Sequence, residues 1–400
     1  MERPAWRFNE RITDTRQLIP RAAENAMKNI VIAGYARTPF TLSRKGELAR
    51  TRPDDLAAAA VRGLVERTGV EVGDIEDLVL GCAFPEGEQG FNMARLVVFL
   101  SGLPISVGGV TVNRFCGSSM QAIHQAAGAI ALGAGEVYIC AGVESMTRVP
   151  MAGFNPMPNP GLAEMMPGAY MSMGETAENL ARQYSISRQE QEAFAVASQE
   201  KAASARQEGR LSDEIVTVNG VEQDGCIRPE TTLETLAELK LAFDENGSVT
   251  AGTSSPLTDG ASAVLVCSED YAKANGLQML ARIRSFAISG CAPETMGIGP
   301  VISTQKALKR AGLQISDIDI IELNEAFASQ SLACIRDLDI DLAKTNLDGG
   351  AIALGHPLGA TGARITGKAA SLLKREGKQF ALSTQCIGGG QGIATILEAV

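Results

Sequence analysis

The feature that most constrains the fold of this chain is an internal duplication. The segment GVEVGDIEDLVLGCAF at 69–84 aligns without a gap with GLQISDIDIIELNEAF at 312–327, at an offset of 243 residues. Each copy follows a stretch with helical patterning and leads into an apolar stretch that is typical of a strand. The chain is therefore predicted to contain two pseudo-symmetric α/β halves.

The same offset extends the duplication to two glycine-punctuated turns. It places Cys116 opposite Gly359, which lies inside GGAIALGHPLGATGAR at 349–364. A helical pattern and then an apolar strand follow each turn, and short apolar strands that alternate with helices predict sheets covered on both faces. The predicted helices are 118–133 and 362–377, and the predicted strands are 137–143 and 379–387.

An inserted segment, at about 150–271, separates the two copies. Its start at 150–173 is rich in Pro, Gly and Met, which predicts either an irregular surface loop or an adaptable apolar lid. The stretch 176–209 is strongly helical, and Ser187 with Glu190 predicts a capping box. The predicted division is an N-terminal extension at 1–26, an N-terminal half at 27–149, a loop domain at 150–271 and a C-terminal half at 272–400.

Composition excludes several classes of protein. A net charge of −10 argues against non-specific nucleic-acid binding, although a local basic patch can still hold an anionic substrate. Eight scattered cysteines without a C-x-x-C pair, and only two histidines, predict neither a disulfide framework nor a metal site and favour a reducing cytoplasm. No apolar run is long enough for a transmembrane segment, and residues 1–26 fit neither a signal nor a typical transit peptide. The phosphate-loop spacing of GARITGK at 362–368 lacks the following Ser or Thr, so a nucleotide triphosphatase is rejected.

The turn NRFCGSSMQAI at 113–123 raises the question of a nucleophile. A cysteine between a strand and a helix can have its thiolate stabilised by the helix N-terminus, although a cysteine can also be an inert core residue. His124 lies too far along the helix to act as its base and is interpreted as structural, whereas His356 occupies the equivalent turn. Cys386 precedes three glycines, which predicts either a plain turn or a second acid/base thiol beside free backbone N–H groups.

Four motifs in order resemble the thiolase family. They are VNRFCGSSMQA at 112–122, NEAFA at 324–328, GGAIALGHPLGATGAR at 349–364 and CIGGGQG at 386–392. The resemblance covers the chain from about Met27 to its end. It implies the family's α/β fold, in which two similar halves form a five-layer α-β-α-β-α core with an inserted loop domain.

The resemblance also implies roles for individual residues. Cys116 matches the nucleophile that becomes acylated, and His356 matches the residue that activates it and helps to hold the substrate oxygen. Cys386 matches the acid/base that acts on the α-carbon of the acetyl unit. Asn324 matches the residue that holds the water of one oxyanion hole, and the backbone N–H groups of Cys116 and Gly388 match the other hole.

The implied activity is an acyl transfer: thiolytic cleavage of a 3-ketoacyl-CoA by coenzyme A in fatty acid β-oxidation. Coenzyme A would be a co-substrate, and no prosthetic group or metal is implied. Ser172 replaces a histidine that is frequent in short-chain biosynthetic thiolases, and CGSS replaces CGSG, so the chain is more similar to degradative members. The residues implied to bind coenzyme A are Arg228, Phe243 and Ser255, and those implied to line the pantetheine or acyl end are Met173, Ala326 and Phe327.

Alternative functions remain open from the sequence. An acetyl-CoA acetyltransferase that forms acetoacetyl-CoA would share every catalytic residue, and a catalytically inactive lipid-binding or scaffold subunit would share the fold. A decarboxylating Cys-His-His enzyme would need a second active-site histidine, and a papain-like hydrolase would not explain Cys386. The expected partners are further copies of this chain, as a homodimer or homotetramer, and a multifunctional α subunit of a β-oxidation complex, for which 150–173 is a docking candidate.

Overall fold

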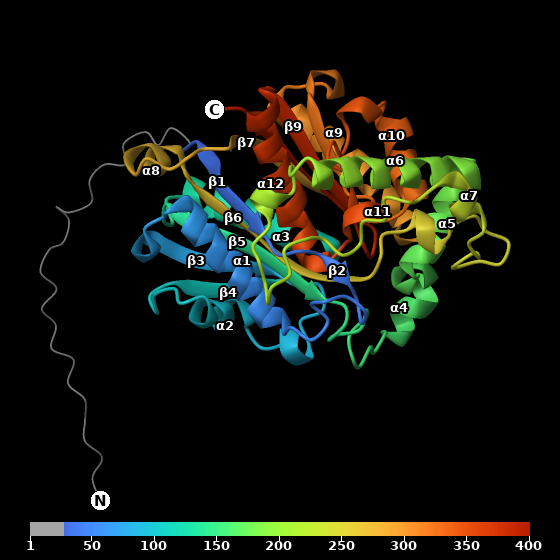
Figure 1. The fold of residues 1–400 in the computed structure, drawn as a ribbon, viewed down its shortest axis with the longest axis horizontal. Helices are drawn as coiled ribbons and strands as arrows, with labels where there is room; N and C mark the ends of the chain where they lie inside the picture. The colour runs from blue at the N-terminus through green and yellow to red at the C-terminus, as the bar shows by residue number, and fades with distance from the viewer. Residues whose placement is uncertain (1–27) are drawn as a thin grey trace, which may run out of the picture.

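The computed structural model describes residues 28–400, and the predicted extension at 1–26 lies outside them. The chain forms two α/β halves that lie against each other (Figure 1). Most predicted helices and strands of the two halves are present within a few residues of their predicted bounds. The N-terminal half contains β1 (Ile30–Arg37), β2 (Thr41–Leu42), α1 (Pro53–Thr68), β3 (Ile75–Gly81), α2 (Met93–Leu100), β4 (Gly108–Val112), α3 (Ser118–Ala131), β5 (Val137–Ser145) and β6 (Thr258–Ser268).

The C-terminal half repeats this order with one strand fewer on the sheet edge. The strands connect in the order β4-β3-β5-β6-β1-β7-β10-β9-β8, so each half contributes matched strands on either side of the β1–β7 contact. That contact is short, because only Val31 with Arg282 and Ile32 with Ala281 pair across it. The C-terminal half contains α8 (Glu269–Ala274), β7 (Ala281–Gly290), α9 (Gly299–Ala311), β8 (Ile320–Leu323), α10 (Ala328–Leu338), α11 (Ala351–Leu354), α12 (Leu358–Glu376), β9 (Phe380–Ile387) and β10 (Gln391–Glu398).

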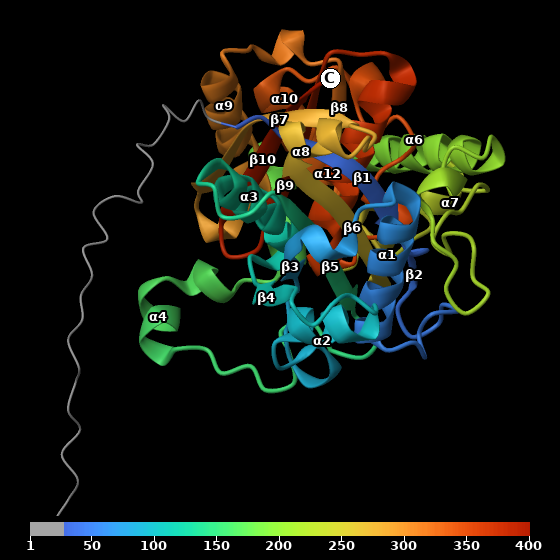
Figure 2. The same ribbon diagram turned by 90° about the vertical axis from the view of Figure 1, so that its left-hand side faces the viewer.

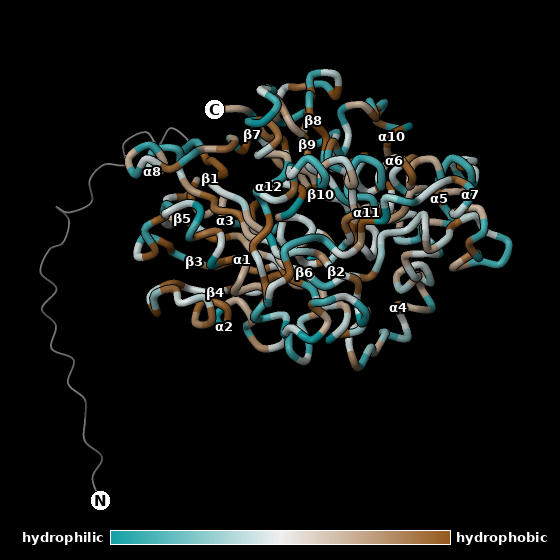
Figure 3. Tube along the Cα trace, viewed as in Figure 1, coloured by the Kyte–Doolittle hydropathy of each residue, from teal (hydrophilic) through white to brown (hydrophobic). Residues whose placement is uncertain are grey.

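Side chains on the two faces of each sheet enter different cores. In β3, Leu78 and Leu80 pack with α1 and α2, whereas Val79 packs with Ile123 of α3 and with α12. This follows from the two-residue period of a strand. A third core joins α9 and α10 to the outer face of the second sheet. The layers are therefore helices, sheet, the central α3 and α12, sheet and helices, and the hydrophobic segments lie mainly on the inner strands (Figure 3).

The duplicated glycines end equivalent helices. Gly69 follows α1 with a φ of 63°, and Gly312 follows α9 with a φ of 72°. Both values lie in the left-handed region that glycine adopts at low cost and that commonly ends helices. The duplication therefore includes the glycines that end the helices as well as the apolar pattern.

The inserted segment runs from the end of β5 to the start of β6, residues 146–257. β6 lies inside the range of 150–271 predicted for the loop domain but is a strand of the core sheet between β5 and β1. The predicted capping box at Ser187 and Glu190 is present, and the predicted helical stretch is divided into α5 and α6. Figure 2 shows α4 projecting from the body of the molecule. The helices of the insertion are α4 (Pro160–Met165), α5 (Met173–Gln183), α6 (Arg188–Gln207) and α7 (Leu233–Ala237).

Within residues 28–400, no helix combines the length and the apolar character needed to cross a membrane.

Candidate active site

A cavity of about 540 Å³ lies between the two halves and the inserted segment. Its walls are mainly apolar, and the three predicted catalytic side chains with sulfur or imidazole groups all reach it. Asn324 and Gly388 do not line the cavity themselves, but each contacts a residue that does: Asn324 contacts His356, and the Gly388 N–H contacts Cys116. The predicted site residues that line the cavity are Cys116, His356, Cys386, Arg228, Phe243, Ser255, Met173, Ala326 and Phe327.

Cys116 occupies the predicted strand-to-helix turn between β4 and α3. Its side chain is only 7% exposed, and Gln385 donates a hydrogen bond to its carbonyl oxygen. A side chain at Gly117 would place its Cβ 2.6 Å from Ile387 Cδ1, so only glycine lets β9 approach this turn. The cysteine is therefore held between elements of both halves.

Backbone N–H groups surround the sulfur of Cys116. Burial raises the pKa of the Cys116 thiol to about 11, while the N–H groups of Gly388 and of Cys116 itself lower it and the charge of Glu144 raises it further. The resting side chain is therefore a thiol, which would need a base in order to act as the predicted nucleophile. The Gly388 N–H belongs to the turn between β9 and β10, and together with the Cys116 N–H it forms a pair of donors that can hold an oxyanion.

His356 is fixed at three of its atoms. Its backbone N–H donates to Thr258 Oγ1 at 2.8 Å, and the glycine before it has a φ of 104°. Its Nδ1 lies 2.6 Å from Thr361 Oγ1, and that hydroxyl donates in turn to the Pro357 carbonyl at 3.0 Å. Because the hydroxyl proton is used there, Nδ1 must carry the proton in the first contact, which leaves Nε2 as an acceptor.

The imidazole of His356 is neutral at physiological pH. Burial, with a smaller contribution from the charge of Arg364, lowers its pKa to about 3. Its Nε2 lies 3.3 Å from the amide nitrogen of Asn324. Asn324 follows β8, and its Oδ1 is buried without a hydrogen-bond partner in the part of the chain that the structure describes. The pair can therefore offer one basic nitrogen and one polar amide to a ligand or water.

Cys386 lies in β9 and is fully buried. Burial raises the pKa of its thiol well above the usual value, and the nearby Cys116 raises it further. Two thiols that disfavour each other's charge can carry only one negative charge between them with ease, so one thiol can act as acid while the other is ionised.

The apolar end of the cavity is formed by the inserted segment and the loop after β8. Phe243 and Phe327 pack edge to face with ring centroids 5.8 Å apart, and Ser255 donates its backbone N–H to Ala326 O at 3.0 Å. Arg228 lines the same cavity from the inserted segment. Met151 also lines it, so the predicted Met-rich stretch contributes at least one wall residue.

His124 is remote from these groups, in agreement with its predicted structural role. Its Nε2 lies 2.8 Å from Thr395 Oγ1, and its ring stacks on Phe286 with centroids 4.2 Å apart.

The sequence did not single out the residues that hold the catalytic side chains. Thr361 fixes the tautomer of His356, and Gln385 fixes the Cys116 backbone. Each lies close to a predicted residue in sequence, but only the fold shows what its side chain contacts. The further lining residues missed are Met146, Gly174, Ala242, Ala251, Ser254, Pro256, Leu257, Met296 and Leu358.

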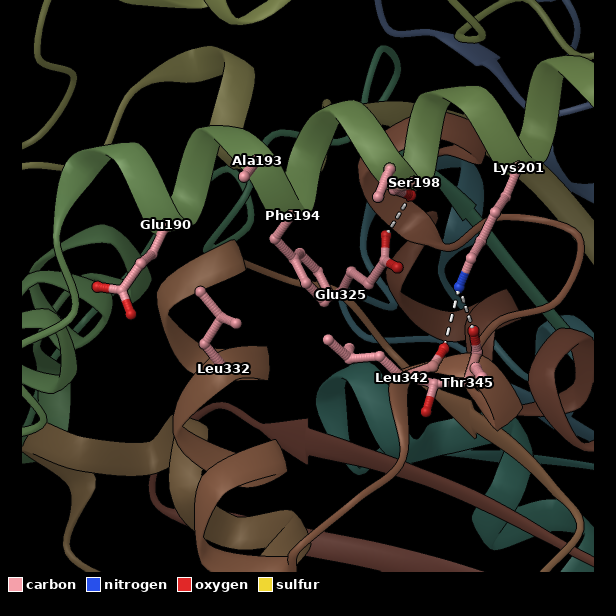
Figure 4. A pocket seen from close by; sticks show the side chains of 11 residues that line it. Glu190, Ala193, Phe194, Ser198, Lys201, Glu325, Leu332, Leu342 and Thr345 are labelled. Atoms are coloured by element: carbon pink, nitrogen blue, oxygen red, sulfur yellow. Dashed lines mark hydrogen bonds between the residues drawn. The ribbon is translucent and has the colours of Figure 1, made fainter.

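A second cavity, of about 470 Å³, lies behind the loop that follows β8. Figure 4 shows Glu325 lining it below α6, with Ser198 donating to the Glu325 carboxylate at 2.6 Å. Glu325 also accepts from Asn346 Nδ2 at 2.7 Å, so its carboxylate is used in packing α6 onto the C-terminal half. Adjacent side chains thus point to opposite sides, since Asn324 contacts His356 and Glu325 lines the second cavity.

The chain is an acyltransferase of the thiolase family, and a histidine and two cysteines line the cavity between its duplicated halves. Residues 30–270 match the model "Thiolase, N-terminal domain", and residues 277–399 match "Thiolase, C-terminal domain". The five-layer thiolase fold expected from the motifs is confirmed.

Known relatives agree along almost the whole chain. It is 49% identical to a 3-ketoacyl-CoA thiolase of Bacillus subtilis (strain 168) over 389 residues, which cover 93% of this chain and 100% of the relative. It is 50% identical to a 3-ketoacyl-CoA thiolase of Aliivibrio fischeri over 389 residues, with the same coverage of both chains. The crystal structure of human mitochondrial 3-ketoacyl-CoA thiolase in complex with CoA superposes with a TM-score of 0.87 at 37% identity, covering 94% of this chain and 98% of that one.

Proposed function

We propose that this protein is a 3-ketoacyl-CoA thiolase that cleaves its substrate with coenzyme A, as an acetyl-CoA C-acyltransferase of fatty acid β-oxidation. The observation that carries the proposal is the convergence of Cys116, His356 and Cys386 in one cavity, with the Gly388 N–H at the Cys116 sulfur. Relatives named 3-ketoacyl-CoA thiolase, about half identical over nearly the full chain, support the substrate class.

In the first half-reaction, Nε2 of His356 takes the proton of the Cys116 thiol. The thiolate attacks the 3-keto carbon, and the Cys116 and Gly388 N–H groups stabilise the oxyanion. The bond between carbons 2 and 3 then breaks, and its electron pair forms the enolate of acetyl-CoA. Protonated His356, with a water held by Asn324, binds the enolate oxygen, and Cys386 delivers a proton to carbon 2.

In the second half-reaction, the Cys386 thiolate takes the proton of incoming coenzyme A. The coenzyme A sulfur attacks the Cys116 thioester, and the same N–H groups hold the tetrahedral oxygen. Cys116 leaves as a thiolate and recovers its proton from His356. The cycle ends with a shortened acyl-CoA and with both thiols protonated.

Two features support a substrate longer than acetoacetyl-CoA. The cavity walls are mainly apolar, as an acyl chain requires. Ser172, which stands where short-chain biosynthetic thiolases often carry a histidine, uses its hydroxyl to cap α5 and so adds no imidazole to the wall. Arg228, Phe243 and Ser255 are proposed to bind coenzyme A, and Met173, Ala326 and Phe327 to bind the pantetheine or acyl end.

The test combines kinetics with mass spectrometry. The protein is mixed with 3-ketoacyl-CoAs of increasing chain length, with and without free coenzyme A. We expect acetyl-CoA release on the long substrates and an acyl adduct on Cys116 when coenzyme A is withheld. Activity confined to the four-carbon substrate would favour the acetyltransferase instead, and an absence of both adduct and acetyl-CoA would reject thiolase activity.

We further propose a homodimer or homotetramer, a cytoplasmic location and, as one docking surface for a β-oxidation α subunit, the segment 150–173. All eight cysteines are free thiols, which supports a reducing compartment. Met157 and Met165 in that segment are strongly exposed, which supports an interaction surface. Size-exclusion chromatography with light scattering tests the assembly.

A further inference from the structure

Glu144 is a buried carboxylate to which the mechanism above gives no role. It lies in β5 with 1% of its side chain exposed. It accepts five hydrogen bonds, and every donor is neutral. They are Cys82 Sγ at 3.8 Å, Ala83 N at 2.8 Å, Phe84 N at 3.2 Å, Gln89 Nε2 at 2.7 Å and Gly359 N at 2.9 Å.

These donors belong to the segments that carry the reacting groups. Gly359 lies in the first turn of α12, three residues after His356. Ala83 is tied to the nucleophile turn, because Asn113 Nδ2 donates to Ala83 O at 2.9 Å and the residue before Cys116 donates to Asn113 Oδ1 at 2.8 Å. One oxygen of Glu144 accepts from both Ala83 and Gly359. The carboxylate therefore connects the Cys116 turn of one half to the His356 turn of the other.

The contacts require the ionised form of Glu144. Burial raises the pKa of the carboxyl group, whereas the N–H groups of Ala83 and Gly359 and the Gln89 amide lower it. Four of the five donors, three backbone N–H groups and one amide nitrogen, can only donate, so a protonated carboxyl would turn a donor of its own toward at least one of them. The charge also acts on the nucleophile, since Glu144 raises the pKa of Cys116.

Resting on the proposed thiolase function, we propose that Glu144 is a positioning residue of this active site. Its carboxylate anion locks the Cys116 turn to the His356 turn across the two halves, and it keeps Cys116 protonated until the histidine removes the proton. The same negative charge of Glu144 thus fixes the relative positions of Cys116 and His356 and sets how readily Cys116 ionises.

The test is Glu144→Gln, followed by two measurements. The amide nitrogen cannot accept, so at least two of the five hydrogen bonds are lost, and we expect kcat to fall roughly 10–100-fold while KM stays within about threefold. The second measurement is alkylation of Cys116 by iodoacetamide at pH 8, followed on its peptide. Loss of the negative charge raises the thiolate fraction, so this rate is expected to rise roughly 3–10-fold.

Two further variants separate charge from shape. Glu144→Asp keeps the charge but shortens the side chain, so kcat should fall about tenfold while alkylation stays within about twofold of the wild type. Glu192→Gln removes another buried carboxylate, in α6, and should leave both measurements unchanged. Fully buried Cys140 reports unfolding and should stay unreactive in every variant.

Three outcomes would overturn the inference: kcat of Glu144→Gln within twofold of the wild type, an unchanged alkylation rate, or alkylation of Cys140 in step with Cys116. Alkylation requires no thiolase substrate. If the protein fails to cleave 3-ketoacyl-CoA but the alkylation rates shift as expected, the proposed substrate is wrong and the control of Cys116 by Glu144 stands. If Glu144→Gln does not fold, Glu144→Asp carries the test, because a kcat within twofold of the wild type in that variant also overturns the positioning role.

Discussion

The turn at Cys116 and its duplicate at Gly359 have the same place in the fold and opposite uses. Each precedes a central helix, and the two helices pack together, with Ala363 N donating to Ser119 Oγ at 2.8 Å. At the first turn the helix N-terminus lies beside the Cys116 sulfur. At the second, Glu144 occupies the Gly359 N–H, and a Cβ at Gly359 would lie 2.4 Å from Val143 O. The duplication supplies two helix N-termini: the Gly359 N–H is used in packing, whereas the turn at Cys116 faces the cavity.

The largest expected effect comes from removing the sulfur of Cys116 at the first turn. Cys116→Ala should lower thiolysis by roughly four orders of magnitude or more, since the covalent intermediate is lost. The assay is acetyl-CoA release from a 3-ketoacyl-CoA together with mass spectrometry of the acyl adduct. Cys267→Ala, in the core strand β6, is the control and should keep its activity per folded molecule. An acyl adduct that survives in Cys116→Ala would place the nucleophile elsewhere.

Adding a methyl group at the second turn tests its packing. Gly359→Ala should lower the free energy of unfolding by about 3 kcal/mol, because Val143 O and Gly81 O cannot both move away. Gly128→Ala in α3 is the matched control. A Cβ there meets nothing within 4 Å, so helix propensity alone should raise stability by up to about 1 kcal/mol. Equal urea midpoints for the two variants would contradict the packing argument.

Thr361 tests the contribution of the second turn. Its hydroxyl accepts from Nδ1 of His356, which leaves Nε2 as the basic nitrogen. Thr361→Val removes the acceptor for Nδ1–H of His356, so the other tautomer becomes populated and kcat should fall about tenfold. Thr361→Ser keeps a hydroxyl and should restore most of the rate. Steady-state kinetics on both variants decides the matter, and a valine variant as fast as the serine variant would refute the tautomer assignment.

The smallest expected effect is the pH dependence of the free energy of unfolding that the two histidines cause. Burial lowers the pKa of both His124 and His356 from 6.5 to about 3. Both stay neutral in the folded protein, while the unfolded chain takes up protons below about pH 6.5. Their contribution to stability is thus complete above pH 6.5 and is lost as the pH falls toward 3.

Between pH 7.5 and 5.5, each histidine should lower the free energy of unfolding by about 1.4 kcal/mol. Urea unfolding at the two pH values measures the loss. His124→Gln should reduce it by one histidine's share, whereas an unchanged loss in that variant would assign the pH dependence to carboxylates.

The features that the sequence predicted well are local or repeated. Helix ends at Gly69 and Gly312 and the capping box at Ser187 depend on neighbouring residues, so their patterns are readable. The meeting of Cys116 with His356 followed from the duplication, because equivalent turns in a pseudo-symmetric fold approach each other.

What the sequence missed depends on distant contacts. β6 lies beyond a long insertion, so nothing near it indicated that it returns to the core sheet between β5 and β1. Glu144 resembles any acidic residue near a strand end until the fold places Gly359 against it. A residue that positions another side chain cannot be recognised from its own sequence neighbourhood when the residues it contacts come from the opposite half.

The order of strands and helices also has a consequence for synthesis on the ribosome. The N-terminal half is made first, but α12, which packs with α3 between the two sheets, and both β9 and β10 come from the last part of the sequence. A nascent chain therefore contains Cys116 for most of translation before His356 and Cys386 have been made. Under the proposed mechanism, a chain that stops before His356 lacks both the base and the second thiol, so it is not expected to complete an acyl transfer.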